Sequence, residues 1–196
     1  EHTPGGSSSG SAAAVAAGIV PLALGTQTVG SVVRPAAFCG VVGFKPSFGA
    51  INKEGAHPLS YSLDHIGFFT RSVDDAAYAF ELLKNHDEPS VNLNSSKAIT
   101  PFQQPKIAFI RTPFDDLMSQ DQVQLMESVV EKLKKAGATV KTIDLPAKYW
   151  DGVKQLHAIL AHEAVQIHKD HMFEKQDLLC QNIKELVDAG LQVSDT

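Results

Sequence analysis

One stretch near the start of the chain decides how the rest is interpreted: GGSSSGSAAAVAAGIVPLALGTQTVGSVVRPAAFCGVVGFKPSFG, residues 5–49. It is dense in glycine, serine and alanine, and such small side chains let a helix pack closely against its neighbours. The pattern predicts a helix, a short buried strand, a loop, a second apolar stretch and a turn, in the order Ser7–Gly18, Val20–Gly25, Thr26–Ser31, Phe38–Phe44 and Lys45–Gly49.

The segment after this stretch carries clearer local signals. We expect coil through Pro58 and Asp64, and then a helix over Val73–Leu83 with Ser72 as its N-cap. Residues 85–105 are polar and contain several prolines, which is typical of a surface connector.

A strand-helix-strand unit is predicted next, because two short apolar runs flank a segment with helical periodicity. A crossover of that length favours parallel pairing of the two strands. From Tyr149 to Leu191 the pattern is helical, with Gly190 as a candidate cap of the last helix. The unit itself comprises Lys106–Arg111, Asp121–Ala136 and Ala138–Leu145.

These elements favour an α/β fold, with a mixed twisted β-sheet flanked by α-helices on both faces. The expected organisation is a core over residues 1–84, a connector over 85–105 and the remainder of the same domain over 106–196.

Composition excludes several classes of protein. With 43% hydrophobic and 20% charged residues, the 196-residue chain has the usage of a globular protein rather than a disordered one. A formal charge of -5 argues against direct nucleic-acid binding. The apolar run Ala12–Leu24 is too short for a membrane span, and we expect none. Two distant cysteines, Cys39 and Cys180, fit a reducing compartment, so a cytoplasmic location is expected.

No cofactor or metal is expected. His162 and Glu163 begin a pattern like that of a zinc-protease helix, but Gln166 stands where the second histidine ligand belongs.

Among short motifs, Gly6-Ser7-Ser8-Ser9-Gly10 matches the G-x-S-x-G nucleophile elbow centred on Ser8. An elbow needs a strand directly before the serine, and only four residues precede Gly5. We therefore regard Ser8, Ser9 and Ser11 as structural, capping a helix or binding a loop.

Residues 5–49 as a whole resemble the amidase signature family through almost their entire length. The resemblance continues through Ser62-Leu63-Asp64-His65-Ile66-Gly67 and Thr70-Arg71-Ser72-Val73-Asp74-Asp75, and is looser beyond residue 84. The bacterial members that include malonamidase and the amidase subunit of glutamyl-tRNA amidotransferase are the most similar in pattern.

This resemblance implies hydrolysis of an amide by two serines and a lysine. In the family the two serines stand 24 positions apart, as do Ser7 and Ser31 here, so Ser31 is the candidate nucleophile and Ser7 the bridging serine that follows a cis peptide bond. The family's lysine lies upstream of the glycine-serine stretch, whereas the first lysine here is Lys45. We therefore expect that lysine before Glu1, and expect residues 1–196 to be inactive alone.

The same resemblance implies an oxyanion hole in the loop Thr28, Val29, Gly30 and Ser31, whose backbone N–H groups would face the developing negative charge. One such donor typically contributes about 3 kcal/mol. Val29 replaces a glycine common in the family, and its side chain is expected to narrow the pocket.

Arg34 is the candidate substrate-binding residue. Many members place an arginine two positions after the nucleophile and an aspartate where Gln27 stands, whereas Arg34 comes three after Ser31. Its guanidinium suits a substrate carboxylate. The alternative is an internal ion pair with an acid such as Asp64.

The sequence thus predicts an amidase that cleaves the C–N bond of a small-molecule amide, with a homo-oligomer possible. Two alternatives stay open: the amidase subunit of a tRNA-dependent amidotransferase, which works with a partner chain, and a non-catalytic module that only folds or binds.

Overall fold

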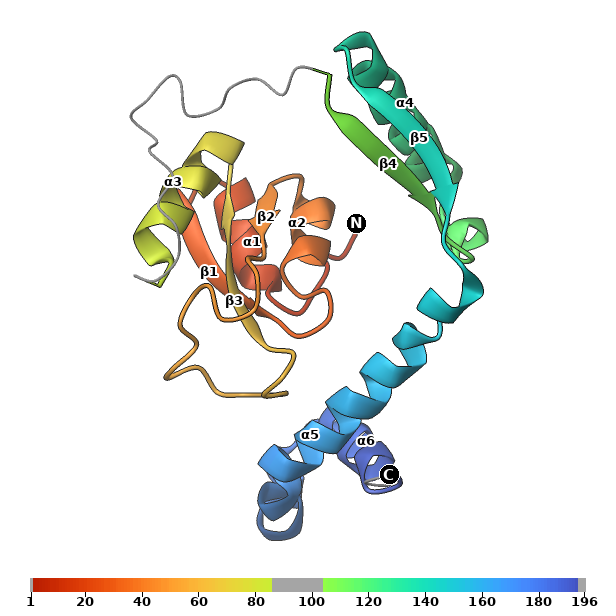
Figure 1. Ribbon diagram of the computed structural model, residues 1–196. Coiled ribbons are helices and arrows are strands. Elements are labelled where there is room, and N and C mark those ends of the chain that lie inside the picture. Colours follow the sequence, from red (N-terminus) through yellow and green to blue (C-terminus); the bar gives the residue numbers. More distant parts are fainter. Residues whose placement is uncertain (1, 86–103, 194–196) are drawn as a thin grey trace. The chain divides into compact units, whose positions relative to one another are not determined.

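The computed structural model describes residues 2–85 and 104–193, and it confirms the α/β class (Figure 1). The chain divides into two compact units, Glu1–Leu93 with His157–Thr196, and Asn94–Leu156. Nearly all of the predicted connector 85–105 lies outside the described residues, so the domain boundaries expected from sequence stay a prediction.

A three-stranded antiparallel sheet forms the centre of the first unit, in the order β1-β3-β2. Its strands are β1 (Leu22–Gln27), β2 (Val42–Phe44) and β3 (His65–Thr70). The middle strand was expected as coil, and that expectation was wrong. β3 shows no period-2 alternation because Gly67 to Thr70 are all buried, so the sequence lacks the usual signal of a strand.

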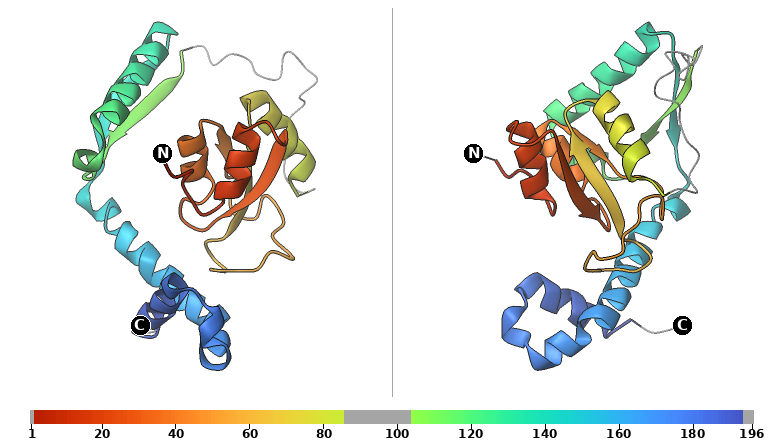
Figure 2. Two further views of the ribbon diagram at one scale, coloured as in Figure 1. Left: turned by 180° about the vertical axis from the view of Figure 1, so that it is seen from behind. Right: turned by 90° about the vertical axis from the view of Figure 1, so that its left-hand side faces the viewer.

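Helices cover both faces of this sheet, as the views in Figure 2 show. α1 (Ser9–Ala16) and α2 (Val33–Cys39) pack with Phe69 on one face, and α3 (Val73–Leu83) packs with Phe68 on the other. Neighbouring residues of a strand point to opposite faces, so two consecutive phenylalanines of β3 join both cores.

The predicted helices of this unit are confirmed with small shifts. α1 lies within the expected Ser7–Gly18, and the Ser72 hydroxyl caps α3 by accepting from the Asp75 N–H at 3.1 Å. The first strand begins and ends two residues later than expected. α2 was not predicted. It begins two residues after the end of the predicted loop, and Gly40, which adopts a left-handed φ of 68°, caps its C-terminus.

The second unit contains the predicted strand-helix-strand motif. β4 (Lys106–Arg111) and β5 (Thr139–Asp144) pair in parallel, and α4 (Gln120–Lys135) connects them. Short 3-10 helices at Asp115–Leu117 and Ala147–Tyr149 flank the motif.

The helical C-terminal part is also confirmed. It consists of α5 (Gly152–Glu174), a 3-10 helix at Gln176–Leu178 and α6 (Gln181–Gly190). Gly190 is not a cap, because Leu191 occupies that position. Gly190 instead allows close packing: a Cβ there would lie 2.1 Å from the Ala161 carbonyl oxygen. None of the described helices has the length and apolar character needed to cross a membrane.

Candidate active site

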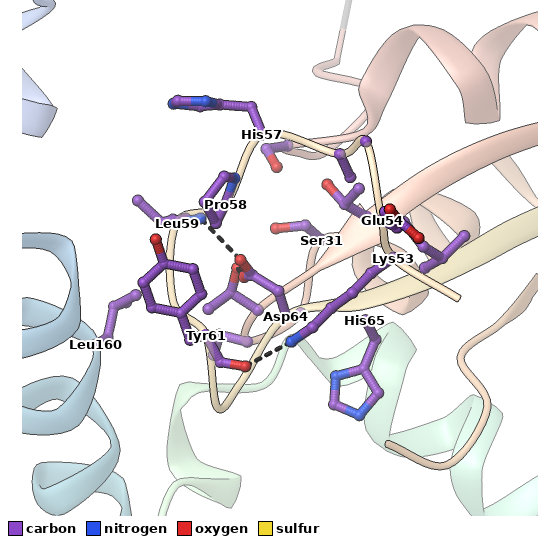
Figure 3. A pocket seen from close by; sticks show the side chains of 18 of the residues that line it. Ser31, Lys53, Glu54, His57, Pro58, Leu59, Tyr61, Asp64, His65 and Leu160 are labelled. Atoms are coloured by element: carbon purple, nitrogen blue, oxygen red, sulfur yellow. Dashed lines mark hydrogen bonds between the residues drawn. The ribbon is translucent and has the colours of Figure 1, made fainter. Parts of the chain in front are cut away.

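A pocket of about 790 Å³ opens in the first unit (Figure 3). One side is formed by the six residues that the sequence singled out: Ser7, Thr28, Val29, Gly30, Ser31 and Arg34. The other side is formed by residues between Asn52 and Ile66, together with Leu160 of α5. The structure therefore brings every predicted site residue to one cavity.

Ser7 reaches this pocket through the turn that precedes α1. The peptide bond Gly6-Ser7 is cis, as the resemblance implied. The next residue, Ser8, fixes the turn to the rest of the site: its N–H donates to the Ser31 carbonyl at 3.2 Å. The Ser8 hydroxyl donates to the Thr26 carbonyl and accepts from the Thr26 N–H, each at 3.1 Å.

These contacts give Ser8 the structural role expected for it. Residues 2–8 contain no strand, so the nucleophile elbow centred on Ser8 lacks the strand that it requires. Ser8 instead holds the start of α1, the end of β1 and Ser31 together.

The loop from Thr28 to Ser31 is folded around the side chain of Gln27, which is only 5% exposed. The Gln27 amide oxygen accepts from the N–H groups of Val32 and Val33 at 2.9 and 3.0 Å, and its nitrogen donates to the Val29 carbonyl at 3.0 Å. Within the described part of the chain, the N–H groups of Val29, Gly30 and Ser31 make no hydrogen bond. These donors are available to a ligand oxygen.

Arg34 forms no ion pair with any acid of residues 2–85 and 104–193. Its Nε donates to the Gly6 carbonyl at 2.8 Å, and no carboxylate among the described residues lies within ion-pair distance of it. The alternative partner, Asp64, accepts instead from the Thr28 hydroxyl at 2.5 Å and from the N–H groups of Leu59 and Ser60 at 2.7 and 2.9 Å. The alternative interpretation, an ion pair between Arg34 and Asp64, is therefore not found among the described residues.

Two lysines lie near this region. Lys53 borders the pocket and donates from Nζ to the Tyr61 carbonyl at 2.5 Å, as Figure 3 shows. Lys45 is not among the residues that line the pocket, and its Nζ donates to the Pro46 carbonyl at 2.6 Å.

Glu163 of α5 binds the segment around Tyr61, a contact that was not predicted from the sequence. Its carboxylate accepts from the Ser60 hydroxyl and, at 3.1 Å, from the Ser62 N–H, on either side of Tyr61. Burial raises the pKa of Glu163, but the hydrogen bonds from Ser60 and Ser62 and the nearby His162 outweigh it and leave the pKa below its usual value. No local pattern could have indicated a pairing between residues about a hundred positions apart.

The pocket is lined by hydroxyl groups, by backbone N–H donors and by both basic and acidic side chains, among them Arg34, Lys53 and Asp64. In the described ranges, no group of three or more histidine, cysteine, aspartate or glutamate side chains could hold a metal ion.

Comparison with known proteins identifies the family of this chain. The family described as Amidase matches residues 1–193. Curated relatives include a glutamyl-tRNA(Gln) amidotransferase subunit from Campylobacter fetus, 43% identical over 77% of this chain and 35% of its own length. The corresponding subunit from Exiguobacterium sibiricum is 42% identical over 76% and 33%. The chain thus spans about a third of these relatives' length.

Solved structures with the same fold include an amidase that is 37% identical, with a TM-score of 0.81 over 97% of this chain and 42% of the other. Another is the peptide amidase of Stenotrophomonas maltophilia, 28% identical, with a TM-score of 0.72 over 96% and 44%. The match over residues 1–193 places this chain in the amidase family.

Proposed function

We propose that this protein hydrolyses the C–N bond of a carboxamide, giving a carboxylate and ammonia or an amine, through an acyl-enzyme at Ser31. One observation carries the proposal: Ser7 and Ser31 line the same pocket as the loop that begins at Thr28. This is the arrangement that attack by one hydroxyl, assisted by a second, requires.

In the proposed mechanism, the Ser31 hydroxyl oxygen attacks the carbonyl carbon while its proton passes to Ser7. Ser7 passes its own proton to a neutral lysine. In the family this lysine lies upstream of the glycine-serine stretch. Proton transfer to the departing nitrogen then breaks the C–N bond. Water releases the acyl group from Ser31 by the same route and restores the hydroxyl.

The oxyanion hole is proposed at the N–H groups of Val29, Gly30 and Ser31, with Thr28 at the start of the loop. Support comes from their lack of other acceptors among the described residues and from Gln27, which fixes the loop from behind. Donors held in place before the reaction stabilise the transition state without reorganising.

Arg34 is proposed to bind a carboxylate of the substrate. Its side chain lines the pocket, and its bond to the Gly6 carbonyl uses Nε, so the two terminal nitrogens can bind a carboxylate. The same bond holds the guanidinium beside the peptide that carries Ser7. An acidic amide is therefore the proposed substrate class.

The experiment uses the complete protein and a panel of small amides, with release of ammonia or amine as the readout. Ser31→Ala should abolish turnover and leave the melting temperature unchanged. Ser128→Ala is the matched control, because that serine lies in α4 and its hydroxyl donates to the Leu125 carbonyl of the same helix. Full activity of Ser31→Ala would reject the proposal.

A second candidate is the amidase subunit of a tRNA-dependent amidotransferase, favoured by the 43% identity to a glutamyl-tRNA(Gln) amidotransferase subunit. Gln27 and Arg34 argue against it, since many family members differ there. Ammonia release from glutamine that requires a co-purified partner chain would favour this second candidate. Turnover of simple amides by the isolated protein would favour the free amidase. A homo-oligomer and a cytoplasmic location stay predictions.

A further inference from the structure

We propose that Asp64 is a positioning residue that connects two sides of the pocket. On one side is the oxyanion loop, residues 28–31, and on the other is the segment of residues 59–61, called the wall below. The inference rests on the proposed function, since it concerns the rate of the same reaction. It assigns to a pocket carboxylate a task other than proton transfer.

Asp64 lies immediately before β3, at the end where His65 pairs with Gln27 of β1. This pairing brings the carboxylate beside Thr28, the first residue of the loop. One oxygen accepts from the Thr28 hydroxyl at 2.5 Å. Asp64 is thus the second side chain that holds the loop. The first is Gln27, whose amide nitrogen donates to the Val29 carbonyl.

The second carboxylate oxygen fixes the opposite wall. It accepts from the N–H groups of Leu59 and Ser60 at 2.7 and 2.9 Å. In Figure 3 the Asp64 side chain points toward Leu59, and a dashed line joins them. One side chain therefore sets the separation between the loop that ends at Ser31 and the wall that carries Tyr61.

The wall is in turn attached to α5, because the Ser60 hydroxyl donates to Glu163. A chain of contacts thus runs from α5 through Ser60 and Asp64 to Thr28. If the wall moved away from α5, Asp64 would move with it and displace the oxyanion loop at Thr28.

These contacts favour positioning over catalysis. Three donors occupy the two oxygens of Asp64, and none of them belongs to Ser7 or Ser31. A carboxylate already engaged by a hydroxyl and two backbone N–H groups is a fixed acceptor. Its effect on the reaction must pass through Thr28 and the wall.

The test is a double-mutant cycle in the complete protein with Asp64→Ala and Thr28→Val. Each single variant should lower kcat by about tenfold to a hundredfold, because small misplacement of catalytic groups has effects of that size. KM should change much less. The double variant should be no slower than Asp64→Ala alone, because both changes break one link.

Thr28→Ser keeps the hydroxyl and should retain kcat close to that of the wild type. The charge-matched control is Asp74→Asn, which removes an exposed carboxylate in the first turn of α3. Amide hydrogen exchange of residues 28–31 should increase in Thr28→Val and not in Thr28→Ser. If Asp64→Ala does not fold, these two Thr28 variants decide the question, because they leave Asp64 and the wall unchanged.

The outcomes separate this inference from the proposed function. Loss of turnover in Ser31→Ala, with unchanged kcat in Thr28→Val or independent additive losses in the cycle, would overturn the role of Asp64 and leave the amidase proposal standing. Absence of any Ser31-dependent turnover in the wild type would reject both.

Discussion

The contacts that stabilise each of the two units differ in how far apart their residues lie in the sequence. In the unit that contains the pocket, side chains bind backbone or side-chain groups far away in sequence, as Ser8 does with Thr26 and Ser60 with Glu163. In the β4-α4-β5 unit, most side-chain hydrogen bonds and ion pairs of the described residues are local, such as Lys134 with Glu131. The site is therefore a product of long-range packing, whereas the second unit is a product of local sequence.

Glycines show the same contrast. Gly67 in β3 is a point of close approach, since a Cβ there would lie 2.6 Å from the Phe44 carbonyl oxygen and 3.0 Å from Val32. Gly137, between α4 and β5, has open space around it and a φ of 94°, so it serves the turn. Substitutions of glycine by a larger residue should therefore show the largest difference in stability loss between the two units.

The largest effect is expected for Gly67→Ala. The added methyl group meets backbone that cannot move aside, and we expect a loss of unfolding free energy of about 3 kcal/mol. Gly152→Ala is the control, because a Cβ there meets nothing within 4 Å. Urea denaturation of both variants checks this, and similar losses in the two would contradict the contrast.

The next effect concerns substrate selectivity in the pocket. Arg34→Ala should lower kcat/KM for an acidic amide by about 2 kcal/mol, roughly thirtyfold, and change that for a neutral amide of similar size much less. Competition between the two amides measures the difference directly. An equal loss for both would mean that Arg34 acts only through its bond to Gly6.

How much the sequence could predict follows the same division. Periodicity and caps predicted β4, α4 and β5 closely, because each depends on its own residues. The resemblance placed Ser7, Ser31 and the loop at one site, yet β3 and α2 were missed. Both depend on contacts with residues far away in sequence, as the pairing of β3 with β1 and the packing of α2 against Phe69 illustrate. The links from Asp64 to Thr28 and from Glu163 to Ser60 have no sequence pattern.

A smaller effect is expected where stability is local. Ser119→Ala removes the hydroxyl that accepts from the Gln122 N–H at the start of α4 and should lower the unfolding free energy by about 1 kcal/mol. Ser72→Ala, the matched change in the pocket unit, should have a similar effect on α3. Thermal unfolding measures both, and neither should alter kcat. A fall in kcat for Ser119→Ala would show that the second unit contributes to the site.

The smallest effect is expected from Glu163→Gln and depends on pH. Because the folded state lowers the pKa of Glu163 below its ordinary 4.5, the ionised carboxylate stabilises the fold above that value. This stabilisation is lost as the pH falls through the lower, folded pKa. The wild type should therefore melt above the variant at neutral pH, and the gap should narrow below about pH 4.5. A gap that is independent of pH would contradict a role for the charge.

The central claim is that Ser31 forms the acyl-enzyme, and quenched-flow mass spectrometry of the complete protein with an activated amide tests it most directly. We expect an acyl adduct on the peptide that contains Ser31. It should form before the carboxylate product is released and be absent in Ser31→Ala. An adduct at Ser7 or Ser8 that persists in Ser31→Ala, with turnover intact, would contradict the account.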